Sequence, residues 1–297
     1  MAEGKIMKAL SGFYYVLTAE GETVACRGRG RLRRDGLSPL VGDRVRIACS
    51  ADGSGAVEEI LPRTNCFVRP AVANVDALVL LAANVNPVTD PFLVDRVAVI
   101  AEHSSCGVIV CINKCDADRG DALYDAFSRG TGYPVLRTSA VTGEGIEALR
   151  ALIRGKTVAF TGNSGVGKSS ILNCIAPEFH LAVGEVSDRL GRGRHTTRHI
   201  ELFDVGDGTL IADTPGFSSF DLTQMQPIST EELQWCFPEF RPHIGRCRFD
   251  DCAHLREPGC AVLAALSAGQ IAPSRHESYR RLYEISARYR DWEQKNH

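Results

Sequence analysis

The sequence predicts a multidomain protein with an N-terminal β-barrel, a central α/β domain and a small α-helical C-terminal domain. The chain has 297 residues, more than one hydrophobic core usually organises. Short β-rich stretches give way near residue 72 to apolar strands that alternate with helices, and near residue 220 the strands stop. We therefore expect domains at residues 1–70, 71–219 and 220–297.

Composition is that of an ordinary folded protein. Hydrophobic residues make up 44% and charged residues 24%, without low-complexity tracts or repeats, so neither a disordered chain nor a solenoid is expected. The N-terminus lacks the apolar core of a secretory signal, and no apolar stretch is long enough to span a bilayer. We expect a monomer in the cytoplasm that does not contact a membrane. An odd number of cysteines, 11, argues against a disulfide framework, and most are expected to be buried.

The N-terminal barrel is predicted from short, evenly spaced strands. The stretches FYYVLT (13–18), TVACRG (23–28) and DRVRIAC (43–49) are separated by the turn signals AEGE and SPLVGD. A five-stranded oligonucleotide-binding (OB) barrel fits this length. An SH3-like barrel or a simple β-appendage stays open on pattern alone.

The central domain is predicted to hold a parallel sheet. VDALVLLAAN (75–84) and GVIVCIN (107–113) are nearly continuous apolar strands, separated by the helical stretch PFLVDRVAVIAEH. Such strands are typical of a sheet covered on both faces by helices. A further helix, GIEALRALIR, leads into the strand KTVAFTG (156–162).

A phosphate-binding loop follows that strand. GNSGVGKSS at 162–170 matches G-x-x-x-x-G-K-[ST] between a strand and a helix, which is the setting that the motif requires. Its residues are Gly162, Asn163, Ser164, Gly165, Val166, Gly167, Lys168, Ser169 and Ser170. Lys168 is expected to reach the β- and γ-phosphates and the Ser169 hydroxyl to bind Mg²⁺. In DTPG, which alone is typical of a turn, Asp213 is expected to hold Mg²⁺ through water and Gly216 to sense the γ-phosphate.

A guanine-recognition motif precedes the phosphate loop, the reverse of the ordinary order. In NKCD, the Asp116 carboxylate can accept two hydrogen bonds that guanine offers and adenine does not, while Asn113 and Lys114 brace the base. Ser139 and Ala140 are expected to close over the guanine carbonyl. Because such motifs all lie at the carboxyl ends of parallel strands, a circular permutation preserves the site.

The C-terminal region contains a metal-binding pattern, C-x₄-C-x-H-x₅-C. Cys247, Cys252, His254 and Cys260 can close a tetrahedral Cys₃His site around one structural Zn²⁺, with free core cysteines as the alternative. Capping boxes are expected at Ser229/Glu232 and Ser274/Glu277. In the last helix, Tyr279, Leu282, Ile285, Tyr289 and Trp292 recur at the spacing of a packing face.

The motif order NKCD, TSA, GNSGVGKSS, GRGRHTTRH, DTPGF, flanked by a barrel and a Cys/His cluster, closely resembles the bacterial RsgA (YjeQ, YloQ) family of small-subunit-dependent GTPases. The resemblance implies a circularly permuted GTPase domain between an OB domain and a zinc domain. It implies GTP or GDP with Mg²⁺ as ligands and the small ribosomal subunit with its rRNA as partner. GTP-bound protein would dock late in subunit maturation, and hydrolysis would release it.

The resemblance assigns GRGRHTTRH to the first switch. Thr197, which we favour over Thr196, is expected to close on Mg²⁺ when the γ-phosphate is present. Phe217 stands where a glutamine would position the attacking water, so slow intrinsic hydrolysis is expected. His195 is the best candidate to supply a polar group, and the alternative is that it stabilises the loop or touches RNA.

Clustered arginines suggest RNA contact on a chain whose net charge is −2. Five lie on the expected barrel: Arg27, Arg29, Arg31, Arg33 and Arg34. Three border the metal pattern: Arg241, Arg246 and Arg248. A solvated basic face is the alternative, and the resemblance favours rRNA. A GTP-dependent switch with a protein effector remains a second hypothesis, whereas NKCD disfavours an ATP-using enzyme.

Overall fold

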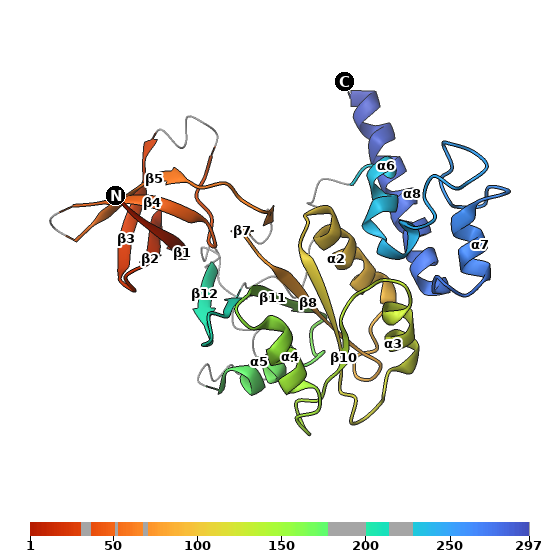
Figure 1. Ribbon diagram of the computed structural model, residues 1–297, viewed down its shortest axis with the longest axis horizontal. Helices are drawn as coiled ribbons and strands as arrows, with labels where there is room; N and C mark the ends of the chain where they lie inside the picture. The colour runs from red at the N-terminus through yellow and green to blue at the C-terminus, as the bar shows by residue number, and fades with distance from the viewer. Residues whose placement is uncertain (31–36, 51–52, 68–70, 178–199, 214–227, 297) are drawn as a thin grey trace.

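The computed structural model describes residues 1–297 except 31–36, 51–52, 68–70, 178–199, 214–227 and 297. A barrel, a central sheet covered by helices, and a helical region follow one another along the long axis of the molecule (Figure 1). No helix in these described ranges combines the length and the apolarity that a bilayer crossing requires.

The N-terminal strands form a closed barrel. The five strands are β1 (Ala2–Leu10), β2 (Phe13–Thr18), β3 (Thr23–Gly28), β4 (Arg44–Cys49) and β5 (Gly55–Ile60). Their order is β1-β2-β3-β5-β4, and β4 pairs back onto β1, which closes the barrel. Ile6, Val16, Val45 and Val57 are fully buried inside it. Closure confirms the predicted five-stranded barrel and rules out an open β-appendage.

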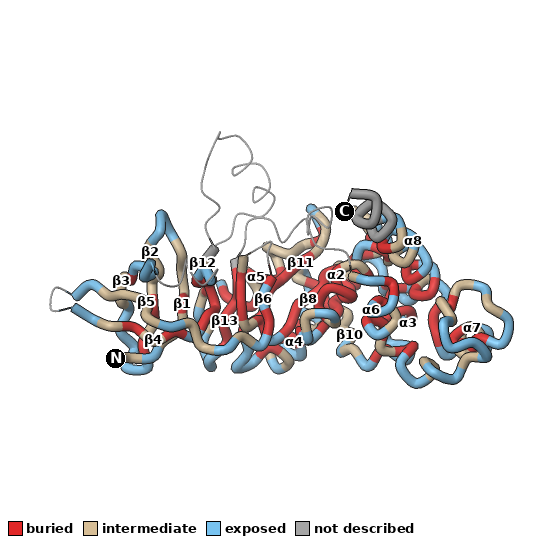
Figure 2. Tube along the Cα trace, turned by 90° about the horizontal axis from the view of Figure 1, so that it is seen from above, coloured by how far each residue is buried: buried red, intermediate tan, exposed pale blue. Residues whose placement is uncertain are grey.

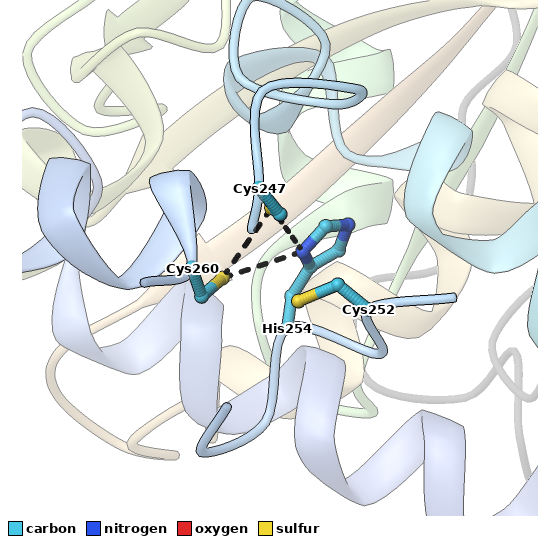
Figure 3. A group of neighbouring side chains, drawn as sticks. All are labelled: Cys247, Cys252, His254 and Cys260. Atoms are coloured by element: carbon cyan, nitrogen blue, oxygen red, sulfur yellow. Dashed lines mark hydrogen bonds between the residues drawn. The ribbon is translucent and has the colours of Figure 1, made fainter. Parts of the chain in front are cut away.

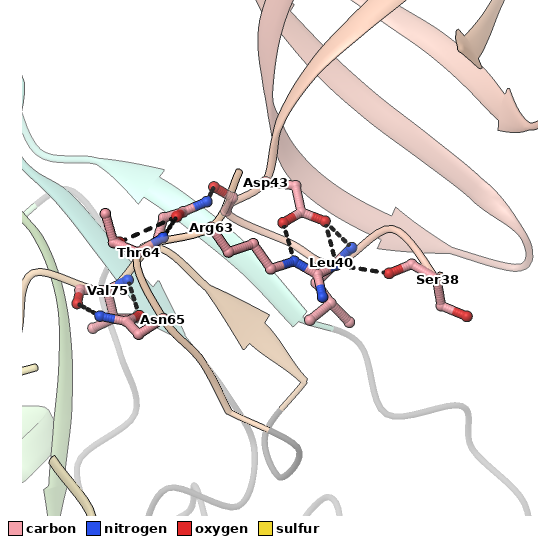
Figure 4. A network of polar contacts seen from close by, with 9 residues as sticks. Ser38, Leu40, Asp43, Arg63, Thr64, Asn65 and Val75 are labelled. Carbon is pink, nitrogen blue, oxygen red and sulfur yellow. Dashed lines mark hydrogen bonds and ion pairs between the residues drawn. The ribbon is translucent and has the colours of Figure 1, made fainter. Parts of the chain in front are cut away.

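A polar network ties the barrel to the chain that leaves it (Figure 4). Asp43 is completely buried, and both its oxygens accept from Arg63, at 2.7 Å from Nε and 2.8 Å from Nη2. Asn65 exchanges two hydrogen bonds with the backbone of Val75, at 2.8 and 2.9 Å. The short antiparallel pair of β6 (Cys66–Phe67) and β7 (Val72–Ala73) lies in this stretch.

The central domain is a parallel sheet with helices on both faces. Its elements are β8 (Ala77–Ala83), α2 (Pro91–His103), β9 (Gly107–Asn113), α3 (Asp121–Ser128), β10 (Val135–Arg137), α4 (Ile146–Ile153), β11 (Thr157–Gly162), α5 (Lys168–Ile175), β12 (Ile200–Asp204) and β13 (Leu210–Asp213). Alternate residues of β8 explain the two layers. Leu78 and Leu80 pack toward α2 and α3, while Val79 and Leu81 pack toward α4 and α5, and all four are buried.

The order of this sheet is β10-β9-β8-β11-β13-β12, with the first five strands parallel and β12 antiparallel. β12 also pairs with the second half of β1, so barrel and central domain share one sheet of 11 strands. Lys8 forms an ion pair with Glu201 at 3.0 Å across this junction, and Lys5 donates to Thr157 Oγ1 at 3.2 Å. Burial at the junction lowers the pKa of Lys5. Figure 2 shows the buried strands of the central sheet running on beside β1.

The C-terminal region is helical, as predicted. It contains α6 (Thr230–Leu233), the 3₁₀ turns η3 (Gln234–Cys236) and η4 (Pro238–Phe240), α7 (Ala261–Ser267) and α8 (Pro273–Asn296). Ser229 accepts from the Glu232 N–H at 3.2 Å and donates to its carboxylate at 2.8 Å, which confirms the first capping box.

One expectation for α8 is wrong, and a second is confirmed only in part. The helix begins at Pro273, so Ser274 lies inside it, and Glu277 pairs with Arg280 at 2.8 Å instead of capping. Proline is preorganised for the first helical position and moves the start upstream. On the expected packing face, Tyr279 is buried and Leu282 packs against the C-terminal core, as expected. Ile285 is 49% exposed although its neighbour Ser286 is buried, so at this level of the helix the covered side is the one that carries Ser286. The side chains of Tyr289 and Trp292 lie outside the described residues.

A buried ion cluster joins α8 to the central domain. Arg275 donates to Asp95 of α2 at 2.6 Å and to both oxygens of Glu239 at 2.7 and 3.0 Å. Its guanidinium carbon lies 4.8 Å from the ring centre of Phe237 and 5.6 Å from that of Phe127 in α3. The C-terminal region therefore packs against α2 and α3 through ion pairs and ring contacts that are buried from water.

Most cysteines outside the Cys/His cluster are buried, as expected. The buried ones are Cys26, Cys106, Cys111, Cys115 and Cys236. Burial raises the pKa of the Cys106 and Cys111 thiols to about 12, so both remain protonated. Cys174 is half-buried, and Cys49 and Cys66 are exposed.

Candidate nucleotide site and metal centre

The parallel sheet brings the sequence motifs together at one edge. NKCD begins at the last residue of β9, TSA follows β10, the phosphate loop begins at the last residue of β11, and β13 ends at Asp213. These strands are parallel, so their carboxyl ends lie on the same side of the sheet. Motifs that are up to 100 positions apart in the chain therefore surround one region, whichever order the chain visits them in.

The phosphate loop has the backbone that its glycines allow. Gly162 has φ 156°, and a Cβ there would lie 2.6 Å from the carbonyl oxygen of Leu81 in the neighbouring strand. Gly167 has φ 99°, and a Cβ there would lie 2.3 Å from the Asn113 side-chain nitrogen. Only glycine fits both positions without displacing backbone or the guanine motif.

The other residues of the loop differ in exposure. Val166 is completely buried in the core under α4 and α5 and anchors the loop. Ser164 and Gly165 are exposed, and the half-buried residues are Gly162, Asn163, Gly167, Lys168, Ser169 and Ser170. Helix α5 begins at Lys168, so the loop runs directly into a helix N-terminus, a favourable place for an anion.

Asn113 connects the guanine motif to the phosphate loop. Its side chain is 2% exposed and donates from Nδ2 to the Val166 carbonyl at 2.8 Å. Thr138 donates to Asn113 Oδ1 at 3.3 Å. Asn113 is therefore a structural brace in which three motifs meet, and its amide is already committed to protein partners.

Asp116 is oriented by Ser139. The Ser139 hydroxyl donates to Asp116 Oδ1 at 2.6 Å and accepts from the N–H groups of Val141 and Thr142 at 3.2 and 3.1 Å. Ser139 is buried whereas Asp116 is exposed, so a fixed hydroxyl orients a carboxylate that faces solvent. The next residue, Ala140, accepts from the Cys174 thiol of α5 at 3.7 Å.

Lys114 has a partner that the sequence did not indicate. Its ammonium donates to the backbone carbonyl of Asn86, in the loop between β8 and α2. Asn86 carries no motif, and its contribution is a carbonyl that any residue possesses. The Asn-Pro pair after a strand end was the available signal, because it marks a turn at the edge where the motifs gather.

Several predicted site residues lie outside the described residues. These are His195, Thr196, Thr197, Gly216 and Phe217. Asp213 is described as the last residue of β13, opposite Glu201 in the register.

The Cys/His cluster forms a compact centre in the C-terminal region (Figure 3). The ligand atoms of Cys247, Cys252, His254 and Cys260 all lie within 4.8 Å of one another. The Cys247 and Cys260 sulfurs are 3.8 Å apart, and His254 Nδ1 lies 3.5 and 3.4 Å from them. Around a tetrahedral zinc ion, bonds of about 2.3 Å to sulfur and about 2.0 Å to nitrogen place two sulfurs about 3.8 Å apart and sulfur about 3.5 Å from nitrogen. The donor set and its spacing therefore fit zinc.

The surroundings of the cluster prepare it for a metal. His254 Nε2 lies 2.8 Å from Gln234 Oε1, which can only accept a hydrogen bond, so the proton is on Nε2 and the Nδ1 lone pair faces the sulfurs. Burial lowers the pKa of His254, which keeps the imidazole neutral. Burial also raises the pKa of the Cys252 thiol to about 12, so a cation must displace its proton. Gln234 was not predicted from the sequence, because it lies in η3, well before Cys247 and outside the Cys/His pattern.

The barrel surface carries a hollow of about 310 Å³ beside the β1–β2 turn. Phe13, Tyr14, Arg27 and Arg29 are among its lining residues. The Arg27 guanidinium stacks over Phe13 at 4.6 Å from the ring centre, and Arg29 pairs with Glu58 at 2.7 Å. Arg31, Arg33 and Arg34 lie outside the described residues. Near the metal centre, Arg248 lies over Phe249 at 5.5 Å, while Arg241 is paired with Glu102 at 2.6 Å.

Comparison with known proteins agrees with this architecture. Residues 60–223 match the family model for the RsgA GTPase, and residues 3–57 match that for the RsgA N-terminal domain. A curated protein of Bacillus anthracis, named small ribosomal subunit biogenesis GTPase RsgA, is 45% identical over 289 residues, covering 96% of this chain and 97% of its own. A protein of the same name from Moorella thermoacetica is 44% identical over 292 residues, covering 98% and 99%.

Solved structures give the same result. YjeQ from Thermotoga maritima has a TM-score of 0.82 at 34% identity, covering 96% of this chain and 98% of its own. YloQ, described as a circularly permuted GTPase, has a TM-score of 0.77 at 37% identity, covering 97% and 96%. With its motifs in permuted order along a sheet that brings them to one edge, the chain belongs to the RsgA family of circularly permuted GTPases.

Proposed function

We propose that this GTPase acts on the small ribosomal subunit late in its maturation, docking in the GTP-bound state and leaving after hydrolysis. The observation that carries the proposal is the meeting of guanine and phosphate motifs at one sheet edge. The names of the relatives, which refer to small-subunit biogenesis, support the choice of partner.

The guanine pocket is assigned to the ends of β9 and β10. Asp116 accepts from the N1–H and the exocyclic amine of guanine, and the hydrogen bond from Ser139 fixes its orientation for both contacts. Adenine presents no such pair of donors, so ATP is rejected. Ala140 closes over the guanine carbonyl, while Lys114 packs along the base and Asn113 joins the pocket to the phosphate loop.

The phosphates are assigned to the loop Gly162–Ser170. Its backbone N–H groups face the phosphate oxygens at the start of α5, and Lys168 neutralises the β- and γ-phosphates. Ser169 and Thr197 supply oxygen ligands to Mg²⁺, with Asp213 acting through water. Mg²⁺, when bound, would neutralise the negative charge that develops on the phosphate oxygens. Gly216 reports the γ-phosphate to the segment that follows.

Hydrolysis transfers the γ-phosphoryl group to water, breaking the bond to the β–γ bridging oxygen and giving GDP and phosphate. Lys168 and Thr197 stabilise the transferring group. We assign His195 to the attacking water, because Phe217 has no polar atom at the place where a glutamine would serve. Contact with the subunit would bring His195 into position against this water and so raise the rate.

The other two domains are assigned to support and recognition. Cys247, Cys252, His254 and Cys260 supply four protein ligands and leave no open position, so the zinc is structural. The barrel (1–70) and the zinc domain (220–297) present rings and arginines to rRNA on either side of the GTPase domain (71–219). We propose that the protein works as a monomer in the cytoplasm, without a membrane partner.

The test is steady-state hydrolysis of GTP and of ATP, with and without purified small ribosomal subunits. Slow, GTP-selective turnover that rises by orders of magnitude with small subunits, and not with large subunits or bulk RNA, is the expected result. Asp116→Asn is the matched control. An amide can donate to the C2 carbonyl of xanthine, so this variant should lose GTP and gain XTP. Equal rates with and without subunits would reject subunit activation and favour a protein effector.

A further inference from the structure

The loop between β8 and α2, residues 84–90, lies against both halves of the nucleotide site. The carbonyl of Asn86 accepts from the Lys114 ammonium in the guanine motif. Pro87 lies beside the phosphate loop, where a Cβ added to Gly165 would be 3.4 Å from its ring. The loop thus contacts the guanine motif and lies beside the phosphate loop, although it carries no nucleotide motif of its own.

This loop has a defined shape that leads directly into α2. Thr89 donates its N–H to the Ala83 carbonyl at 2.8 Å, and its hydroxyl accepts from the Ala83 N–H at 2.9 Å. Asn84 and Val88 form an antiparallel bridge within it. Asp90 is then the N-cap of α2 and accepts from the Phe92 N–H at 3.0 Å. The loop and the first turn of α2 therefore form one hydrogen-bonded unit that includes Asn86.

Helix α8 of the zinc domain fixes this end of α2. The Arg281 guanidinium carbon lies 3.6 Å from the ring centre of Phe92, and its Nη1 lies 3.6 Å from the Asp90 carboxylate. Further along both helices, the buried pair of Arg275 and Asp95 holds them together at 2.6 Å. The two helices lie side by side in Figure 1.

We propose that Arg281 is a positioning residue for guanine-nucleotide binding. Its contacts with Asp90 and Phe92 position the first turn of α2 and the loop before it. That loop carries the Asn86 carbonyl, which holds the Lys114 side chain in place to pack against the guanine base. This inference rests on the proposed role of Lys114 in the guanine pocket. Lysine has a flexible four-carbon stem, so a carbonyl that holds its ammonium lowers the ordering cost of binding. The zinc domain thereby contributes to nucleotide affinity without contacting the nucleotide.

The test is the dissociation constant of GDP, measured by titration calorimetry on the full chain with Mg²⁺ at 25 °C. Arg281→Met keeps the apolar stem but removes the charge and the ring contact. An exposed cation–π contact and a surface ion pair are each modest, so about three- to fivefold weaker GDP binding is expected. Asp90→Asn retains a good N-cap and should cause a similar loss, and the double variant should not add the two losses.

Arg280→Met is the matched control, because Arg280 is the adjacent residue on α8 and pairs with Glu277 of the same helix at 2.8 Å. It should leave GDP affinity unchanged. Lys114→Met tests whether the effect of Arg281 passes through Lys114. In the Lys114→Met background, Arg281→Met should not weaken GDP binding further, whereas a general loss of protein stability would weaken it in either background.

The outcomes separate the two proposals. Unchanged affinity in Arg281→Met, an equal loss in Arg280→Met, or additivity with Lys114→Met would overturn the positioning role and leave the guanine pocket intact. Absence of GDP binding by the wild type would overturn the pocket itself, whereas no effect of Lys114→Met would overturn the role of Lys114 and with it the route from Arg281.

Discussion

Replacement of Arg275 by Met should selectively destabilise the zinc domain and its joint with α2. Arg275 and Asp95 are fully buried and Glu239 is 3% exposed, and the guanidinium makes three charge-assisted hydrogen bonds to the two carboxylates. Methionine fills much of the volume between the rings of Phe127 and Phe237. It leaves two carboxylates in a site without a cation, and breaking a buried ion pair in this way costs about 3–5 kcal/mol.

Intrinsic fluorescence offers a local assay for this loss. The chain has two tryptophans, Trp235 and Trp292, and both belong to the C-terminal region. Urea unfolding followed by tryptophan emission therefore reports on this region and not on the barrel. With a denaturant dependence of about 2 kcal/mol/M, a loss of about 4 kcal/mol lowers the midpoint by about 2 M.

Charge removal and pH separate this explanation from simple loss of packing. Burial raises the pKa of Asp95 to about 6, against the attraction of Arg275, so without the arginine the pKa rises further. An acid whose folded pKa is raised binds more protons when folded, and its stability contribution falls as pH rises through that window. The defect in Arg275→Met should therefore be smaller at pH 5 than at pH 8. Arg275→Met combined with Asp95→Asn and Glu239→Gln should recover most of the midpoint. A loss below about 1 kcal/mol, or no recovery in the triple variant, would refute the reasoning.

Three other outcomes are expected. Gly167→Ala should weaken GDP binding at least tenfold in a calorimetric titration while the fold is retained, because the new Cβ would lie 2.3 Å from the Asn113 amide; unchanged affinity would contradict the close approach. Chelation should release one zinc per chain, measured by a colorimetric zinc dye, and shift tryptophan emission, and Cys247→Ser should bind none. In the native protein, Cys49 and Cys66 should react first with a thiol reagent, and the zinc ligands only after chelation; early modification of more than these two would contradict the burial pattern.

Local patterns in the sequence were sufficient for the layout of the site. Strands such as 107–113 are recognisable because contiguous apolar residues suit a sheet covered on both faces. The phosphate loop and NKCD are recognisable because their chemistry depends on neighbouring residues in a set spacing. The rule that motifs meet at the carboxyl ends of parallel strands then gives their convergence, whatever the chain order. The roles of individual residues in that site remain predictions.

Where two local signals competed at one helix end, the sequence was less informative. Ser274 and Glu277 have the spacing of a capping box, but Pro273 begins α8 one residue earlier. Ile285 continues the apolar spacing of Tyr279 but is exposed while its neighbour Ser286 is buried, because periodicity does not reveal which side of the helix the rest of the domain covers.

From the sequence alone, this protein was determined to have a barrel, a permuted nucleotide-binding domain and a Cys/His centre, because each depends on residues close together in the chain. Tertiary structure alone decided the partners that support them. Asn86 holds Lys114, Gln234 orients His254, and Arg275 reaches Asp95 from 180 positions away. A backbone carbonyl has no sequence signature, and a buried charge can pair with any opposite charge that folding brings near. Such contacts follow from the packing of whole helices on a sheet, which no short stretch of sequence contains.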